Sequence, residues 1–196
     1  MKHIICGNYG SGKTTRILKT VLAYPGTVIW QDGQRDGFER LLTINPNTGI
    51  KHLFETDLQN VGAADLYIKD LTEFIKGGKY FITPDNKMEI KGLYPEWYWR
   101  KNGNLNDVLI VYDGDAWFLS SESTDMLWKL PERGADIIIS TSYPSEILKR
   151  KGSLLDISAA IADGWEVYIP DVLESHMFKR LTLGSGKEAA KWLESI

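Results

Sequence analysis

The stretch Ile4–Thr15, which reads I-I-C-G-N-Y-G-S-G-K-T-T, decides the fold. Its first three residues are apolar and predict a short strand, and residues 7–14 match the pattern G-x-x-x-x-G-K-[ST] at every position. Residues 15–23 follow with apolar side chains at helical spacing, among them Ile17, Leu18 and Val21. A strand, a glycine-rich turn and a helix in this order are the context that a phosphate-binding loop requires.

This loop is predicted to bind the phosphates of a nucleotide. Its three glycines let backbone N–H groups turn toward an anion, and the start of the following helix adds partial positive charge. Lys13 is expected to reach the β- and γ-phosphates, and the Thr14 hydroxyl to bind Mg²⁺, which takes oxygen ligands and is usually shared with the phosphates. A chance glycine-rich turn is the alternative. The expected contact residues are Gly7, Asn8, Tyr9, Gly10, Ser11, Gly12, Lys13, Thr14 and Thr15.

A second candidate element lies in the middle of the chain. Residues 108–112 are apolar at every position, which is typical of a strand covered on both faces of a parallel sheet, and Asp113 follows directly. Beside a phosphate loop, an acidic residue at the end of such a strand is predicted to hold Mg²⁺ or its water. The alternative is that Asp113 caps the next segment. Asp115 is the nearest second carboxylate and a candidate to orient the attacking water.

The remaining elements predict an α/β protein with a mostly parallel central sheet. Strands are expected at 27–31, 136–142, 165–169 and 178–183, and helices at 38–42, 63–76 and 186–196. The strand at 136–142 ends in hydroxyl side chains, of which Thr141 is predicted to contact the γ-phosphate or water. Segments 79–83 and 87–90 flank a Pro-Asp-Asn turn and predict a β-hairpin inserted around 78–104. One domain over 1–196 is expected.

Composition excludes several classes of protein. A single cysteine among 196 residues excludes a disulfide scaffold, a Cys-rich zinc site and an iron–sulfur cluster. With 23 basic and 26 acidic residues the net charge is −3, so any contact with DNA must come from a local basic patch. The candidate patch is Lys149, Arg150 and Lys151 in a helix expected at 146–151; a solvated helix end is the alternative. With no long apolar run, no membrane span is expected, and we expect a complete cytoplasmic protein.

The order of these motifs resembles viral ATPases of the FtsK/HerA superfamily. The resemblance lies in the phosphate loop, in residues 108–118 and in residues 132–141, and the families concerned are the zonula-occludens-toxin-like assembly ATPases of filamentous phages and the small viral genome-packaging ATPases. It implies a three-layer P-loop NTPase domain (RecA/ASCE-like) with ATP and Mg²⁺ as ligands. It also implies a homo-oligomeric ring in the host cytoplasm that packages or translocates DNA, or assembles virions, as it hydrolyses ATP.

Three departures from these families stand in the sequence. The families place Glu directly after the Walker B Asp, whereas this chain has Gly114 there and Asp115 one position later. Their sensor strand usually ends in Gln or Asn, whereas Thr141 and Ser142 stand in that region here. The filamentous-phage proteins also carry a membrane span, and its absence here favours a packaging motor.

An arginine donated by a neighbouring subunit is part of what the resemblance implies. Arg133 matches the Arg-x-Gly position of these families, with Arg150 and Arg180 as other candidates. Such an arginine accelerates hydrolysis because it neutralises charge that develops on the transferred phosphoryl group. A surface side chain without this role is the alternative for Arg133.

Two other functions fit the phosphate loop. A small nucleoside or nucleotide kinase has the right length, although the single cysteine removes the four-cysteine zinc lobe of the thymidine-kinase type and no Arg-rich lid is present. A nucleotide-dependent switch that hydrolyses slowly is the third possibility, and the absence of Glu at position 114 suits it.

Overall fold

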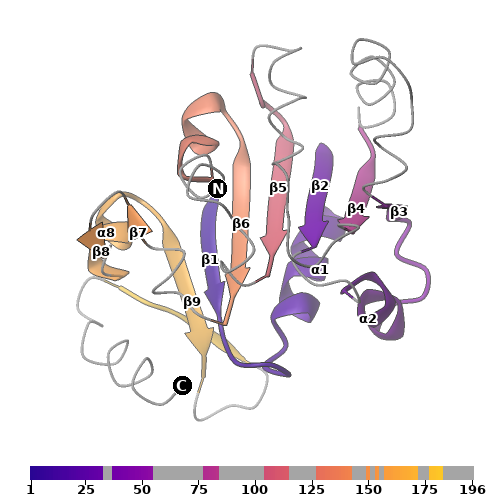
Figure 1. Cartoon of the computed structure of the whole chain (residues 1–196), viewed down its shortest axis with the longest axis horizontal. Coiled ribbons are helices and arrows are strands. Elements are labelled where there is room, and N and C mark those ends of the chain that lie inside the picture. Colours follow the sequence, from indigo (N-terminus) through magenta and orange to yellow (C-terminus); the bar gives the residue numbers. More distant parts are fainter. Residues whose placement is uncertain are drawn as a thin grey trace.

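A computed structural model describes residues 1–32, 37–54, 77–83, 104–114, 127–142, 149–150, 153–154, 157–171 and 177–182. The elements in chain order are β1 (Lys2–Cys6), α1 (Lys13–Ala23), β2 (Thr27–Asp32), α2 (Gly37–Ile44), β3 (Lys51–Phe54), β4 (Lys79–Thr83), β5 (Val108–Asp113), the 3-10 turn η2 (Pro131–Arg133), β6 (Asp136–Thr141), β7 (Lys149–Arg150), β8 (Ser153–Leu154), α8 (Ile157–Ala162), β9 (Glu166–Pro170) and β10 (Phe178–Arg180). The predicted α/β class is confirmed (Figure 1).

Eight strands form one mixed, mostly parallel sheet in the order β10-β9-β1-β6-β5-β2-β4-β3. Every neighbouring pair in it is parallel except β10 and β9. The strand β6 lies between β1, which leads into the glycine-rich loop, and β5, which ends in Asp113. Because the strands are parallel, the carboxyl ends of β1, β2, β5 and β6 meet at one edge of the sheet, at the lower side of Figure 1.

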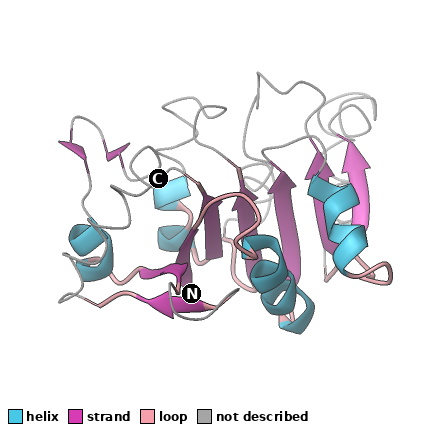
Figure 2. Cartoon of the chain, turned by 90° about the horizontal axis from the view of Figure 1, so that it is seen from below, coloured by secondary structure: helices cyan, strands magenta, loops and turns pink. Residues whose placement is uncertain are grey.

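Apolar side chains on both faces of the sheet explain why these segments form strands. All six residues of β2 and five of the six in β5 are buried, as in a sheet that is covered on both sides. On one face the core contains residues of α1 and α2, among them Ile17, Val21 and Leu41. On the other face it contains Leu127, Trp128 and Leu130, and Ala160 of α8. The described part of the chain is therefore compatible with a three-layer α/β fold (Figure 2).

Two sequence predictions need correction. Segment 79–83 is a strand, but β4 lies inside the main sheet with β2 and β3 as parallel neighbours, so it is not one arm of a separate hairpin. The helix predicted at 146–151 is wrong at Lys149–Arg150, which form β7 and pair antiparallel with β8. Gly152 follows in the sequence, and glycine has a low helix propensity.

Several predicted segments lie outside the described residues. They are the helices at 63–76 and 186–196, the second hairpin arm at 87–90, and Lys151 of the basic patch. The predictions that rest on them stay predictions. Within the described residues, no helix is long and apolar enough to cross a membrane.

Candidate functional site

The glycines of the predicted phosphate loop are required by its backbone. Gly10 and Gly12 have φ angles of 79° and 90°, which side chains other than glycine rarely adopt. A Cβ on Gly7 would stand 2.4 Å from Ser11 Oγ. The loop is also tied to the sheet, because the N–H of Gly7 donates to the carbonyl oxygen of Thr141 at 3.2 Å. The loop backbone therefore has a fixed place at the carboxyl end of β1.

The amino end of α1 has features that favour an anion. Gly12 is the N-cap and supplies no side-chain hydrogen bond, and the first turn of the helix has no acidic residue. The first helical residue is Lys13, a cation at the positive end of the helix dipole, where positive charge is unfavourable unless an anion is present. The Lys13 ammonium donates to the backbone carbonyl oxygens of Gly7 and Asn8, the latter at 3.2 Å. This cluster of donors is what a phosphate group would satisfy.

Three polar side chains form a row across the ends of neighbouring strands. Asp32 of β2 is the register partner of Asp113 of β5, and Asp113 is the partner of Ser140 of β6. Because side chains alternate along a strand, each lies on the same face as the core residue two positions before it. Those core residues pack in the cluster that contains α1, and they are Trp30, Val111 and Ile138. The row therefore faces the layer that holds the glycine-rich loop.

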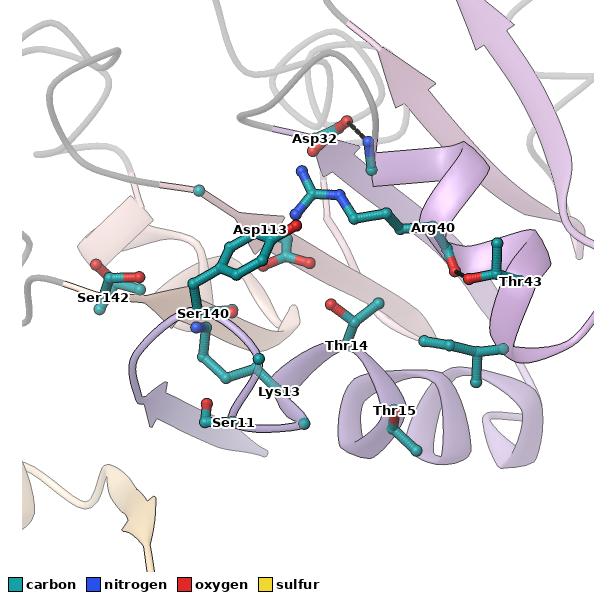
Figure 3. Close-up of a pocket in the computed structure, with 17 residues that line it drawn as sticks. Ser11, Lys13, Thr14, Thr15, Asp32, Arg40, Thr43, Asp113, Ser140 and Ser142 are labelled. Atoms are coloured by element: carbon teal, nitrogen blue, oxygen red, sulfur yellow. Dashed lines mark hydrogen bonds between the residues drawn. The ribbon is translucent and has the colours of Figure 1, made fainter. Parts of the chain in front are cut away.

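A cavity of about 300 Å³ joins the loop to this row. It is lined by residues 9–15, by the α2 residues Gly37, Arg40, Thr43 and Ile44, and by the carboxyl ends of β2, β5 and β6 (Figure 3). Its size is at the lower end of the range for small-molecule pockets. The structure thus brings together the predicted loop residues 9–15 with Asp113 and Thr141, which come from three separate parts of the sequence.

The predicted magnesium ligands face each other across the cavity. Thr14 lies at the start of α1 with its hydroxyl pointing toward Asp113 (Figure 3). No group of three or more His, Cys, Asp or Glu able to hold a metal ion occurs in the part of the chain that the structure describes. One hydroxyl and one carboxylate fit Mg²⁺ only together with phosphate oxygens and water, which is how Mg²⁺ is usually bound in nucleotide sites.

Ser140 and Thr141 at the end of β6 differ in the face that they present. The Cα partner of Thr141 is Cys6, whereas Ser140 belongs to the row of Asp32 and Asp113. Both line the cavity. Ser140 is fully buried, and its Oγ has no hydrogen-bond partner among the described residues. A buried hydroxyl without a partner is costly, so Ser140 has an unused donor at the site.

Sequence reasoning missed Asp32 and Arg40. Asp32 is only 2% exposed, and its Oδ2 accepts a hydrogen bond from the Gly37 N–H at 3.0 Å. Arg40 of α2 points its guanidinium into the space between Asp32 and Asp113 (Figure 3), with Cζ 5.3 Å from the centroid of the Tyr9 ring. Asp32 carries the same signal as Asp113, an acidic residue at the end of an apolar strand. No local pattern marks Arg40.

Neither Arg133 nor Arg180 lines the cavity of its own chain. Arg133 belongs to η2, which precedes the amino end of β6, whereas the cavity is at the carboxyl end. A six-residue strand spans roughly 17 Å, so Arg133 does not reach this cavity. Arg180 of β10 pairs with Glu166 at 2.8 Å, and Arg150 lies in β7. Asp115 is outside the described residues.

Cys6 lies beside the loop but is not suited to act as a nucleophile. It is the last residue of β1 and is fully buried. Burial raises the pKa of its thiol to about 12, so the thiol stays protonated at neutral pH. Its place in the core shared by Ile4 and Ile139 indicates a packing role.

Comparisons with protein-family models, with curated proteins and with solved structures found no match to this chain. What the chain does is therefore inferred from its own residues and from the resemblance of its motifs.

Proposed function

We propose that this chain is a P-loop ATPase of RecA/ASCE-like fold that binds Mg-ATP at the amino end of α1 and hydrolyses it. The observation that carries the proposal is the uncapped start of α1, with Lys13 as its first residue, opening into a cavity that Asp113 lines on the other side. Helix dipole, backbone N–H groups and ammonium all favour an anion there. The strand order, with β6 between β1 and β5, supports the RecA/ASCE-like assignment.

In this function the loop binds the triphosphate and Lys13 exchanges its carbonyl partners for phosphate oxygens. Thr14 and Asp113 would hold Mg²⁺, which supplies positive charge against the negative charge that develops on the phosphoryl group. Ser140 would donate a hydrogen bond from its hydroxyl to a phosphate oxygen or to the attacking water. These roles need no large movement, since all four side chains already line one cavity.

The biological use of the hydrolysis is proposed from the resemblance. A ring of identical subunits would package or translocate viral DNA, or assemble virions. Arg133 lies at the other end of β6 from the cavity of its own chain, so a role in hydrolysis would require the cavity of a neighbouring subunit, which a ring provides. A basic patch at Lys149 and Arg150 would be repeated around such a ring, so contacts that are weak in one subunit would add up.

The test is phosphate release from Mg-ATP and Mg-GTP by the wild-type protein and by Lys13→Ala, with and without double-stranded DNA, and with nucleosides and nucleotides as possible acceptors. Lys19→Ala is the matched control, because Lys19 is an exposed residue of the same helix that does not line the cavity. We expect the wild-type protein to release phosphate, and DNA to increase the rate. Lys13→Ala should abolish the release, and Lys19→Ala should leave it unchanged.

If phosphate appears on a nucleoside or nucleotide and DNA has no effect, the protein is a kinase and the proposal of a motor is wrong. If the wild-type protein and Lys13→Ala release phosphate from ATP at equal rates, the cavity at the amino end of α1 is not the site of hydrolysis.

A further inference from the structure

We propose that Asp32, at the end of β2, is the carboxylate that orients the attacking water in this ATPase. The inference rests on the proposed function and assigns a residue that the motif pattern does not mark. Asp113 keeps its proposed role as a magnesium ligand. The carboxylate that orients the water is then on the neighbouring strand β2, and not in the residues that follow Asp113.

The register of the sheet places the two carboxylates side by side. Asp32 and Asp113 are Cα partners on adjacent parallel strands, which lie about 4.8 Å apart. Both side chains lie on the face toward α1, and both line the cavity. Thr14 points toward Asp113 (Figure 3), so Asp113 is the carboxylate nearer to the loop's magnesium ligand. Asp32 lies one strand further from β1, at the side of the cavity that α2 closes.

Asp32 is held in place by the start of α2. Its Oδ2 accepts the Gly37 N–H at 3.0 Å, and the positive end of the α2 dipole favours the charged carboxylate. The fit is close, because a Cβ on Gly37 would stand 2.5–2.6 Å from all three carboxyl atoms of Asp32. A carboxylate that is 2% exposed and yet lines a cavity is costly to bury. A carboxylate offers about four acceptor sites, so Asp32 can accept a hydrogen bond from water in addition to the one from the Gly37 N–H.

Arg40 contributes the charge that lets two carboxylates lie together. Its guanidinium points into the space between Asp32 and Asp113 (Figure 3). Two adjacent carboxylates repel each other, and a cation between them offsets this repulsion. Arg40 comes from the same helix that fixes Asp32, so α2 supplies both the anchor and the counter-charge. Arg40 is in this sense a positioning residue.

The reaction step is hydrolysis of the terminal phosphoanhydride. The water oxygen forms a bond to the γ-phosphorus, and the bond from that phosphorus to the β–γ bridging oxygen breaks. ADP leaves with the electron pair of the broken bond, and the proton of the water ends on the inorganic phosphate. Asp32 accepts a hydrogen bond from the water and so orients a lone pair of the water oxygen toward the γ-phosphorus.

The experiment compares Asp32→Asn with Asp115→Asn, because Asp115 is the carboxylate that the sequence suggests. Asparagine is as large as aspartate, and its side-chain oxygen still accepts the Gly37 N–H, so the α2 cap is kept while the negative charge is lost. Glu39→Gln is the matched control, since Glu39 is an exposed carboxylate on α2 that does not line the cavity. The readouts are the Kd of a fluorescent ATP analogue with Mg²⁺, the ratio of ATP to ADP on the protein after single-turnover incubation, and kcat at several Mg²⁺ concentrations. Asp113→Asn is measured beside them as the variant that loses the proposed magnesium ligand.

We expect Asp32→Asn to bind Mg-ATP within about three-fold of the wild-type Kd, to retain bound ATP unhydrolysed, and to lose about 10²-fold or more in kcat. The loss in Asp115→Asn should be smaller, and Glu39→Gln should match the wild type. Three results would overturn the inference: normal turnover in Asp32→Asn, a larger loss in Asp115→Asn, or a raised Mg²⁺ requirement in Asp32→Asn that equals that of Asp113→Asn. If the wild-type protein itself neither binds nor hydrolyses Mg-ATP, the proposed function fails first, so the two failures are distinguishable.

Discussion

The change Gly37→Ala tests the placement of Asp32 without altering any charge. The new Cβ would stand 2.5–2.6 Å from the three carboxyl atoms of Asp32, whereas ordinary contact begins at 3.4 Å. The carboxylate must therefore retreat by about 0.9 Å, or α2 must shift by a similar amount. A displacement of about 1 Å at a reacting group can lower a rate by about 10²-fold. We expect kcat to fall by one to two orders of magnitude on this scale.

Stability should change in the same variant by an amount that the packing sets. Overpacking a buried site costs about 1–3 kcal/mol, and the gain in helix propensity from glycine to alanine offsets up to about 1 kcal/mol of this. In a chain of this size each 1 kcal/mol of lost stability lowers Tm by about 2–4 °C. We expect a Tm lower by a few degrees.

The assay is kcat and the Kd for Mg-ATP at a temperature at least 15 °C below the lowest Tm, roughly the margin that keeps the variants folded. Glu39→Ala is the control, because it raises helix propensity on the exposed side of α2 and does not touch the cavity. A Gly37→Ala variant with wild-type kcat and wild-type Tm would refute the reasoning. It would mean that the Asp32 carboxylate can shift without loss of stability and that its position does not affect turnover.

Three further predictions follow from individual side chains. Arg40→Gln leaves Asp32 and Asp113 facing each other without the guanidinium, so Tm without Mg²⁺ should fall and added Mg²⁺ should restore it more than in the wild type, as thermal melts at several Mg²⁺ concentrations will detect. Ser140→Ala removes a buried hydroxyl that has no partner among the described residues, so Tm without nucleotide should stay or rise while the Kd for Mg-ATP increases about 2–10-fold, measured by titration; a lower Tm would contradict this. Burial lowers the pKa of His3 below 6.5 despite the nearby Glu166. The contribution of neutral His3 to stability is therefore complete above pH 6.5 and is lost as the pH falls from 6.5 toward the lowered pKa. His3→Gln should flatten the dependence of the unfolding free energy on pH in that window.

The strands that border the site could be predicted from the sequence because their signal is local. Val108–Tyr112 is apolar at every position, which is typical of a strand covered on both faces of a parallel sheet. The loop glycines carry a signal of the same local kind, since Gly10 and Gly12 have the positive φ angles that the motif implies.

The neighbours of each strand could not be predicted, because they depend on contacts between distant parts of the chain. Asp32 and Asp113 are 81 positions apart in sequence, and only the register of β2 with β5 shows that they face each other. The same reason explains β4, whose residues read as half of a hairpin until its two parallel neighbours are known. At β7 the charged residues Lys149 and Arg150 suggested a helix face, although a two-residue strand carries too little pattern to identify.

Binding of a nucleoside triphosphate at the amino end of α1 underlies every role proposed for this site. Isothermal titration of Mg-ATP into the wild-type protein and into Lys13→Ala measures this without any assumption about turnover. We expect about one site per chain in the wild type and a Kd at least about ten-fold higher in Lys13→Ala, because hydrogen bonds to a charged group contribute about 1.5–3 kcal/mol. Equal affinity in the two proteins, or no binding by the wild type, would contradict the account.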